Sequence, residues 1–191
     1  MSDAALWLIA GPNGVGKTTY ARRYLREVAG TDAFVNLDEI ARGLQPLRST
    51  PDAETARAAG RYALERLHWA ISHKRSVAVE TTLAGQTHRR SISLAHAAGM
   101  RVELVFCLLP DVETCLARIA ARVAAGGHHV PQADVRRRYA RAVENFAGYA
   151  ALVDHWVVLD TQRTDPRLAA HGPPLRIADE ALAQALPLSW P

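Results

Sequence analysis

Cysteine is scarce in this 191-residue chain, which carries only Cys107 and Cys115. Two thiols are too few for the disulfide framework of a small secreted domain, and neither lies in a pattern that binds zinc. One stands in a predicted strand and the other in a predicted helix. We therefore expect both cysteines to be core residues.

Lysine is almost absent too, because Lys17 and Lys74 are the only lysines among 23 basic residues. In a chain so rich in arginine, a lysine at a motif position that demands one points to function. The formal net charge of +4 fits either a solvated surface or a tilt toward phosphate-bearing ligands. It is too small to indicate nucleic acid.

Long apolar runs are missing as well. No stretch approaches the ~18 consecutive apolar residues of a membrane-spanning helix, and Ser2 and Asp3 stand where a secretory leader would be basic. We therefore expect a soluble, cytoplasmic protein. With 49% apolar residues, residues 1–191 suffice for one buried core and a single domain.

Short apolar runs alternate with longer helical patterns along the chain. This order predicts a three-layer α/β fold in which helices cover a central parallel five-stranded sheet. The runs are residues 5–10, 34–37, 77–79, 102–108 and 156–159. Ligands of such sheets bind at the carboxyl ends of the strands, so the residues that close each run are candidates for a site.

The first run ends in a complete G-x-x-x-x-G-K-[ST] phosphate loop, with a predicted strand before it and a predicted helix after it. Its backbone N–H groups can surround phosphates, its lysine contacts the terminal phosphates of ATP, and its threonine hydroxyl binds Mg²⁺. Lys17 is thus a candidate catalytic residue and Thr18 a candidate metal ligand. The candidate nucleotide-binding residues are Gly11, Pro12, Asn13, Gly14, Val15, Gly16, Lys17, Thr18 and Thr19.

The second run closes as FVNLDEIAR, with Asp38 at the strand end and Arg42 one helical turn later. A carboxylate here can accept the proton of a substrate hydroxyl that attacks ATP, which a kinase needs and a nucleotide switch does not. The alternative is that Asp38 caps a helix that begins at Glu39. We assign Asp38 to catalysis and Arg42 to substrate binding.

The third run closes as VAVETTL, which brings Glu80 and Thr81 to the same edge of the sheet. A carboxylate in an otherwise apolar strand is costly unless it has a partner. We expect Glu80 either to support Mg²⁺ through water or to bind hydroxyl groups of the substrate together with Thr81.

Two helices rich in arginine and joined by a glycine pair at 126–127 follow the fourth run. We predict a lid at about residues 122–140 that closes over the nucleotide. Arg118, Arg122 and Arg138 would then stabilise the charge on the transferred phosphoryl group. The alternative is a solvated arginine face.

The remaining polar segments give weaker signals. His128 and His129 lack the cysteine or carboxylate pattern of a zinc site, and we assign His128 to substrate binding in the lid. The turn at residues 160–163 fits an ordinary loop better than a purine site. The tail, residues 172–191, is expected to add a short strand and a helix.

Together these motifs resemble those of the zeta-toxin-like family of phosphate-loop kinases. The resemblance covers about residues 5–162 and is carried by GPNGVGKTTYARRY, FVNLDEIAR, ETTLAG, LARIAARV, GGHHVP and RRRYARAVENFAGYAALVD. It implies a fold similar to nucleotide and shikimate kinases, with ATP and Mg²⁺ as ligands. It further implies phosphorylation of a hydroxyl of UDP-N-acetylglucosamine and restraint by an antitoxin protein.

The resemblance also implies roles for single residues. The family's general base maps onto Asp38, its acidic-Gly-Thr segment onto residues 80–82, and a lid arginine that contacts phosphates onto Arg122. The sequence departs from the family's motifs at two places on the substrate-binding side of the site. The third strand reads Glu-Thr-Thr instead of Glu-Gly-Thr, and histidines occupy the region of a second lid arginine, whose task would fall to Arg138.

The sequence thus predicts an ATP- and Mg²⁺-dependent kinase that acts on a hydroxyl of a small molecule. A nucleoside or antibiotic kinase is open within this class, and a nucleotide-dependent regulatory ATPase is the alternative outside it. A polynucleotide acceptor is disfavoured because the arginine segments lack interleaved aromatic residues that could stack on bases.

Overall fold

The computed structural model of the chain describes residues 4–29, 31, 33–44, 53–127, 129–188 and 190. The strands are β1 (Ala5–Ala10), β2 (Phe34–Val35), β3 (Val77–Thr81), β4 (Arg101–Leu108), β5 (His155–Asp160), β6 (Arg167–Gly172) and β7 (Arg176–Ile177). The helices are α1 (Lys17–Ala29), α2 (Leu37–Leu44), α3 (Ala53–Ser72), α4 (Thr87–Ala97), α5 (Val112–Ala124), α6 (Gln132–Ala150) and α7 (Glu180–Ala185).

The strands form one sheet in the order β2-β3-β1-β4-β5-β6-β7. The pairs from β2 to β5 are parallel, whereas β6 and β7 are antiparallel additions at the β5 edge. The predicted α/β class with a mainly parallel sheet is confirmed, but the predicted number of five strands is wrong. The sheet has seven strands because β6 is exposed at its start and β7 is exposed throughout, so neither produces a continuous apolar run.

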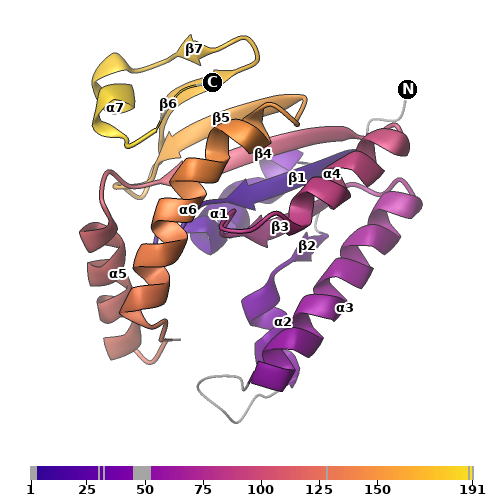
Figure 1. The fold of residues 1–191 in the computed structure, drawn as a ribbon, viewed down its shortest axis with the longest axis horizontal. Coiled ribbons are helices and arrows are strands. Elements are labelled where there is room, and N and C mark those ends of the chain that lie inside the picture. Colours follow the sequence, from indigo (N-terminus) through magenta and orange to yellow (C-terminus); the bar gives the residue numbers. More distant parts are fainter. Residues whose placement is uncertain are drawn as a thin grey trace.

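Helices cover both faces of the sheet (Figure 1). Alternate residues of β1 serve the two sides, because side chains of a strand point to opposite faces in turn. Leu6 and Leu8 belong to a core shared with α3, α4 and α6, whereas Trp7 and Ile9 belong to a core shared with α1 and α5. A fully buried leucine contributes about 1.5–3 kcal/mol to folding. Burial on both faces explains why β1 reads as an unbroken apolar run.

The second predicted run differs from the observed element. Only Phe34–Val35 is a strand, Asn36 interrupts it, and α2 begins at Leu37. The polar Asn36 is buried at 4% exposure, so it needs hydrogen-bond partners instead of apolar neighbours. The carboxyl end of β2 therefore turns directly into a helix beside β3.

The carboxy-terminal segment forms a small unit at the edge of the sheet (Figure 1). As predicted, it contains strand and helix, with β7 and α7 following β6. Asp179 caps α7, because its Oδ1 accepts a hydrogen bond from the backbone N–H of Leu182 at 3.0 Å. Trp190 returns to the main core, where its ring stacks near Trp156 and meets Phe146 edge-on.

Both cysteines lie in the core, as predicted, and both are free thiols. Burial raises the pKa of Cys107 on β4 to about 12 and that of Cys115 on α5 to about 11. Both groups therefore stay protonated and unreactive at neutral pH. In the part of the chain that the structure describes, no helix combines the length and apolarity needed to cross a bilayer.

Candidate active site

The phosphate loop connects β1 to α1, and its path requires glycine. Gly11, Gly14 and Gly16 have positive φ angles of 137°, 86° and 95°. A Cβ atom on Gly11 would lie 2.0 Å from the carbonyl oxygen of Cys107, and one on Gly14 would lie 2.6 Å from that of Cys115. The loop therefore packs directly on β4 and α5, and its fold matches the motif found in the sequence.

Lys17 is the first residue of α1 and is only 6% exposed. Its Nζ donates a hydrogen bond to the carbonyl oxygen of Pro12 at 2.8 Å and lies 3.8 Å from Oε1 of Glu80. A buried ammonium group needs such partners. The positive charge is thereby held between the loop and the end of β3.

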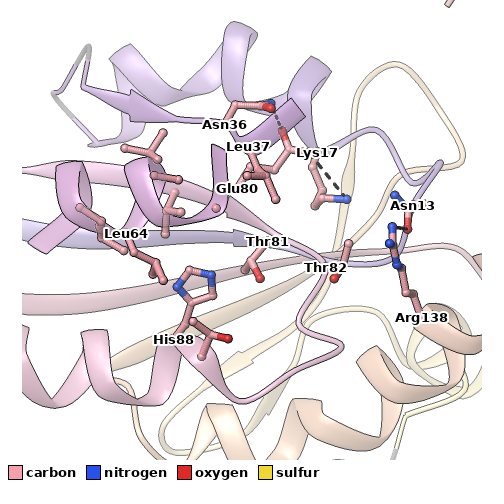
Figure 2. Close-up of a pocket in the computed structure, with 16 residues that line it drawn as sticks. Asn13, Lys17, Asn36, Leu37, Leu64, Glu80, Thr81, Thr82, His88 and Arg138 are labelled. Atoms are coloured by element: carbon pink, nitrogen blue, oxygen red, sulfur yellow. Dashed lines mark hydrogen bonds and ion pairs between the residues drawn. The ribbon is translucent and has the colours of Figure 1, made fainter. Parts of the chain in front are cut away.

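Glu80 connects three neighbouring residues at the end of β3. Its Oε2 accepts hydrogen bonds from Oγ1 of Thr18 and from Nδ2 of Asn36, each at 2.7 Å, while its Oε1 faces Lys17. Figure 2 shows Asn36, Glu80 and Lys17 converging from separate elements. The structure thus brings Lys17, Thr18 and Glu80, all candidates from the sequence, to one place.

Asn36 belongs to this cluster but was missed in the sequence. Besides its bond to Glu80, its Oδ1 accepts a hydrogen bond from the backbone N–H of Glu39 at 3.1 Å and so caps α2. A polar residue that directly closes an apolar strand was the available signal. The expectation of one continuous apolar run over residues 34–37 hides this signal.

Asp38 lies inside the first turn of α2, which begins at Leu37. The alternative that Asp38 caps a helix starting at Glu39 is therefore wrong, because Asn36 supplies the capping oxygen. The side chain of Asp38 lies outside the described residues, and its catalytic role stays a prediction. The same holds for the side chain of Arg42 and for all of His128.

Thr81 and Thr82 continue from Glu80 at the edge of the same cavity. Oγ1 of Thr81 accepts a hydrogen bond from the backbone N–H of Leu83 at 3.2 Å. Leu83 has a positive φ of 58° although it is not glycine, and its carbonyl accepts a bond from Asn145 of α6 at 2.8 Å. Helix α6 thus fixes the turn that leads from β3 to α4.

The arginines of the predicted lid have different surroundings. Arg138 of α6 donates from Nη1 to Oδ1 of Asn13 in the phosphate loop at 3.2 Å. Arg136 instead binds Glu113 of α5 with two hydrogen bonds of 2.5 and 3.1 Å, and Arg137 binds the nearby Asp134 at 2.7 Å. Of the three consecutive arginines, Arg138 therefore reaches the loop.

Arg118 and Arg122 both lie on α5. Nη2 of Arg118 donates to the carbonyl oxygens of Thr161 and Gln162, each at 2.8 Å, so this side chain holds the turn after β5. Arg122 is exposed, and its side chain packs closely against Gly127 in the connection to α6. In this structure Arg118 thus contacts the turn after β5, and its role at the phosphoryl group stays a prediction.

Two cavities adjoin the phosphate loop. A cavity of about 220 Å³ lies between Gly16, Thr19 and Tyr20 on one side and the turn of residues 161–164 on the other, with Arg118 in its wall. A larger cavity of about 400 Å³ extends from Lys17 along the ends of β2 and β3 to α3 and α4. The larger one contains Asn36, Glu80 and the two threonines of β3's end.

The larger cavity changes in character along its length (Figure 2). Lys17, Asn13 and Arg138 lie at one end, and Leu64 of α3 lies toward the other. Its apolar lining consists of Val35, Leu37, Ala63, Leu64, Leu67 and Val79. The arrangement suits a ligand with a polar end near the loop and an apolar body near α3.

His88 is a second residue of the cavity that was missed in the sequence. It lies in the first turn of α4, and Figure 2 shows its ring directed into the cavity between Leu64 and Thr81. Burial, and to a lesser degree the neighbouring His68, lower the pKa of His88 to about 4. The ring is therefore uncharged at neutral pH. Its position at the start of the helix that follows β3 was the available signal.

Comparisons with known proteins identify the family. A protein-family model described as an AAA domain matches residues 6–144, from β1 into α6. An uncharacterized protein of Haemophilus influenzae is 32% identical over 130 residues, which make up 68% of this chain and 88% of that protein.

Solved structures of other proteins share the fold. The AvrRxo1-ORF1:-ORF2 complex with ATP matches with a TM-score of 0.72 and 18% identity over 97% of this chain, which spans 64% of the matched chain. The PezAT chromosomal toxin-antitoxin system of Streptococcus pneumoniae matches with a TM-score of 0.69 and 16% identity, over 100% of this chain and 79% of the other. At these identities the likeness concerns the fold alone.

Proposed function

The chain belongs to the AAA domain family, and on that premise we propose that it is an ATP-dependent kinase that phosphorylates a hydroxyl group of a small molecule. One observation carries the proposal. The cavity of about 400 Å³ is lined by Lys17 of the phosphate loop and by Glu80 at the neighbouring strand end. An acceptor bound there would face the terminal phosphate of ATP.

Binding of ATP is supported by the geometry of the loop. The glycines at positive φ turn the backbone around a space at the start of α1, where N–H groups and the helix dipole favour phosphates. We assign the adenosine part to the smaller cavity, whose turn of residues 161–164 is held by Arg118. ATP in the matched AvrRxo1-ORF1:-ORF2 complex supports the same ligand.

The proposed metal is Mg²⁺, for which Thr18 and Glu80 supply the chain's oxygen atoms. Oγ1 of Thr18 and Oε2 of Glu80 lie 2.7 Å apart next to the loop, and oxygen is the ligand that this ion prefers. When bound, Mg²⁺ neutralises part of the phosphate charge. The contact of Glu80 with Lys17 and Asn36 keeps its carboxylate oriented toward the loop.

The proposed reaction is direct transfer of the γ-phosphoryl group. The acceptor's hydroxyl oxygen forms a bond to the γ-phosphorus while the bond from that phosphorus to ADP breaks. Asp38 takes the hydroxyl proton in this proposal. Its backbone lies in the first turn of α2, two residues after Asn36, which lines the cavity. Lys17, Arg138 and Arg122 stabilise the negative charge that spreads over the transferred group.

UDP-N-acetylglucosamine is the specific acceptor that the resemblance to zeta toxins suggests, and an antitoxin protein is the suggested partner. The shared fold with the PezAT toxin-antitoxin system supports the suggestion of an antitoxin partner. Growth arrest on expression, relieved by Asp38→Asn, would support toxicity. A nucleoside or antibiotic acceptor, and a regulatory ATPase without acceptor, are the alternatives.

Transfer of label from γ-labelled ATP tests the proposal. Incubation with Mg²⁺ and a metabolite extract is expected to move label into a small organic molecule. Asp38→Asn should reduce this transfer at least about 100-fold, the scale of general base catalysis, while ATP binding persists. Release of label only as free phosphate, in the presence of every extract, would favour the regulatory ATPase.

A further inference from the structure

We propose that the cavity of about 400 Å³ binds an uncharged alcohol with an apolar body, whose second polar group hydrogen-bonds to the ring of His88. This inference rests on the proposed kinase function and specifies its acceptor. It differs from a nucleotide sugar, which carries two phosphates into the site.

The charges of the described part of the cavity argue for an uncharged acceptor. Among its described lining residues the only cations are Lys17 and Arg138. Lys17 contacts the loop carbonyl of Pro12, and Arg138 contacts Asn13, so both lie where ATP phosphates are expected. The carboxylate of Glu80 would repel a further anion close by. A diphosphate brought in by the acceptor would thus lack a basic partner in the described part of the cavity.

The far end of the cavity argues for an apolar body. There α3 contributes Ala63, Leu64 and Leu67, and the sheet contributes Val35 and Val79. Burying apolar ligand surface against such walls contributes a binding free energy of roughly 25 cal/mol per Å² of surface removed from water. A cavity of this volume lies in the range that holds one compact ligand.

Gly60 supports a ligand in this space independently. It lies within the 20-residue helix α3 and lines the cavity. Glycine inside a helix costs about 1 kcal/mol relative to alanine. A Cβ atom at Gly60 would meet no atom of the described residues within 4 Å, so packing among those residues does not require glycine here. The missing side chain keeps the cavity open.

His88 supplies a polar contact near the apolar end. Its ring lines the cavity, and its buried Nδ1 has no hydrogen-bond partner among the described residues. The described residues therefore do not fix the tautomer through Nδ1, and the neutral ring can offer either an N–H donor or a lone pair. A hydroxyl or carbonyl group of the acceptor would satisfy it. His68 on α3 differs, because its Nε2 already contacts Oγ of Ser91 at 3.1 Å.

The test separates a metabolite extract into neutral and anionic fractions by anion exchange and offers each with γ-labelled ATP. Label is expected in a product derived from the neutral fraction. Label only in products of the anionic fraction, or in purified UDP-N-acetylglucosamine, would overturn the inference but leave the kinase intact. Label released only as inorganic phosphate from all fractions would instead reject the kinase function and this inference with it.

Two sets of variants locate the acceptor. Gly60→Leu should fill the cavity and raise the apparent KM for the neutral fraction at least tenfold, with unchanged affinity for an ATP analogue. Gly43→Leu is the matched control, because Gly43 also lies in a helix with open space around its Cβ position. Gly60→Met provides a second filling variant should Gly60→Leu fold poorly. An unchanged KM in the folded filling variant would overturn the location.

His88→Ala should raise the same apparent KM by roughly 5- to 100-fold, the range expected for a lost buried hydrogen bond. His88→Gln, which keeps a donor and an acceptor, should restore part of the affinity. The KM for ATP should not change in either variant. Equal acceptor KM values for wild type and His88→Ala would disprove the contact, and a parallel loss of ATP affinity would indicate a structural role instead.

Discussion

At the scale of single residues, Glu80 shows how the fold prepares a charged group. One carboxylate oxygen accepts bonds from Thr18 and Asn36, and the other faces Lys17. Lys17 and Thr18 belong to the start of α1, and Asn36 directly follows β2, so the carboxylate joins the phosphate loop to the ends of β2 and β3. Replacing any partner would leave a half-buried charge less satisfied, at a cost of about 1–3 kcal/mol.

His88 makes stability depend on pH. Its pKa lies at about 4 in the folded chain against 6.5 for an unperturbed histidine, so the unfolded state binds the proton more tightly. Its contribution to stability is complete above pH 6.5 and is lost as the pH falls toward 4. We expect the wild type to lose about 2 kcal/mol more than His88→Gln between pH 7 and pH 5.

Urea unfolding of both proteins at the two pH values measures this difference. Carboxylates elsewhere titrate in the same window, but they are common to both proteins and cancel in the comparison. Arg90 and His68 are retained in both, which keeps the local charge constant apart from His88. Identical losses for the two proteins would mean that His88 is not held neutral by burial.

Prediction of single residues from sequence is possible where a motif has fixed spacing. Lys17 and Thr18 were assigned by the phosphate-loop pattern, and the structure brings both to Glu80. Asn36 and His88 have no such pattern. Asn36 matters because β2 lies beside β3, and His88 matters because α4 turns it toward α3, so both depend on pairing and packing between distant segments.

At the scale of elements, the path of the chain between β1 and α1 depends on glycines at positive φ angles. Gly11 and Gly16 share positive φ angles of 137° and 95°. They differ in surroundings, because a Cβ atom at Gly11 would lie 2.0 Å from the carbonyl oxygen of Cys107, whereas one at Gly16 would meet nothing within 4 Å. The pair therefore separates backbone strain from steric conflict with β4.

Gly11→Ala should destabilise the protein by at least about 2 kcal/mol more than Gly16→Ala. Both variants carry the strain of a positive φ, about 1–3 kcal/mol, but only Gly11→Ala forces β4 and the loop apart. Guanidinium unfolding followed by circular dichroism gives the two free energies. Equal destabilisation would show that the loop can move away from β4 at little cost.

The elements themselves were largely predictable where burial covers two faces. The runs of β1 and β4 are apolar throughout because helices cover both sides of them. The edge strands β6 and β7 are partly exposed, so their sequences carry no comparable signal. Strand β2 is short because Asn36 must cap α2, a demand that apolar periodicity cannot reveal.

At the scale of the whole molecule, the strand order brings the candidate groups together. Placing β3 between β2 and β1 sets the ends of all three strands side by side, although these strands end at residues 10, 35 and 81 of the sequence. Helix α3 then closes the far side of the cavity, and α6 brings Arg138 to the loop (Figure 2). The sequence predicts a parallel sheet. The set of residues that lines the proposed acceptor cavity, however, arises only from the packing of these elements.

The central claim is that the terminal phosphate of ATP faces the cavity of about 400 Å³. A crystal structure with a non-hydrolysable ATP analogue and Mg²⁺ measures this most directly. We predict a γ-phosphate beside Lys17, with Glu80 near the metal, the Asp38 carboxylate facing the cavity, and open space between them for a hydroxyl group. A γ-phosphate walled off from the cavity, or an Asp38 side chain turned away from it, would contradict the claim.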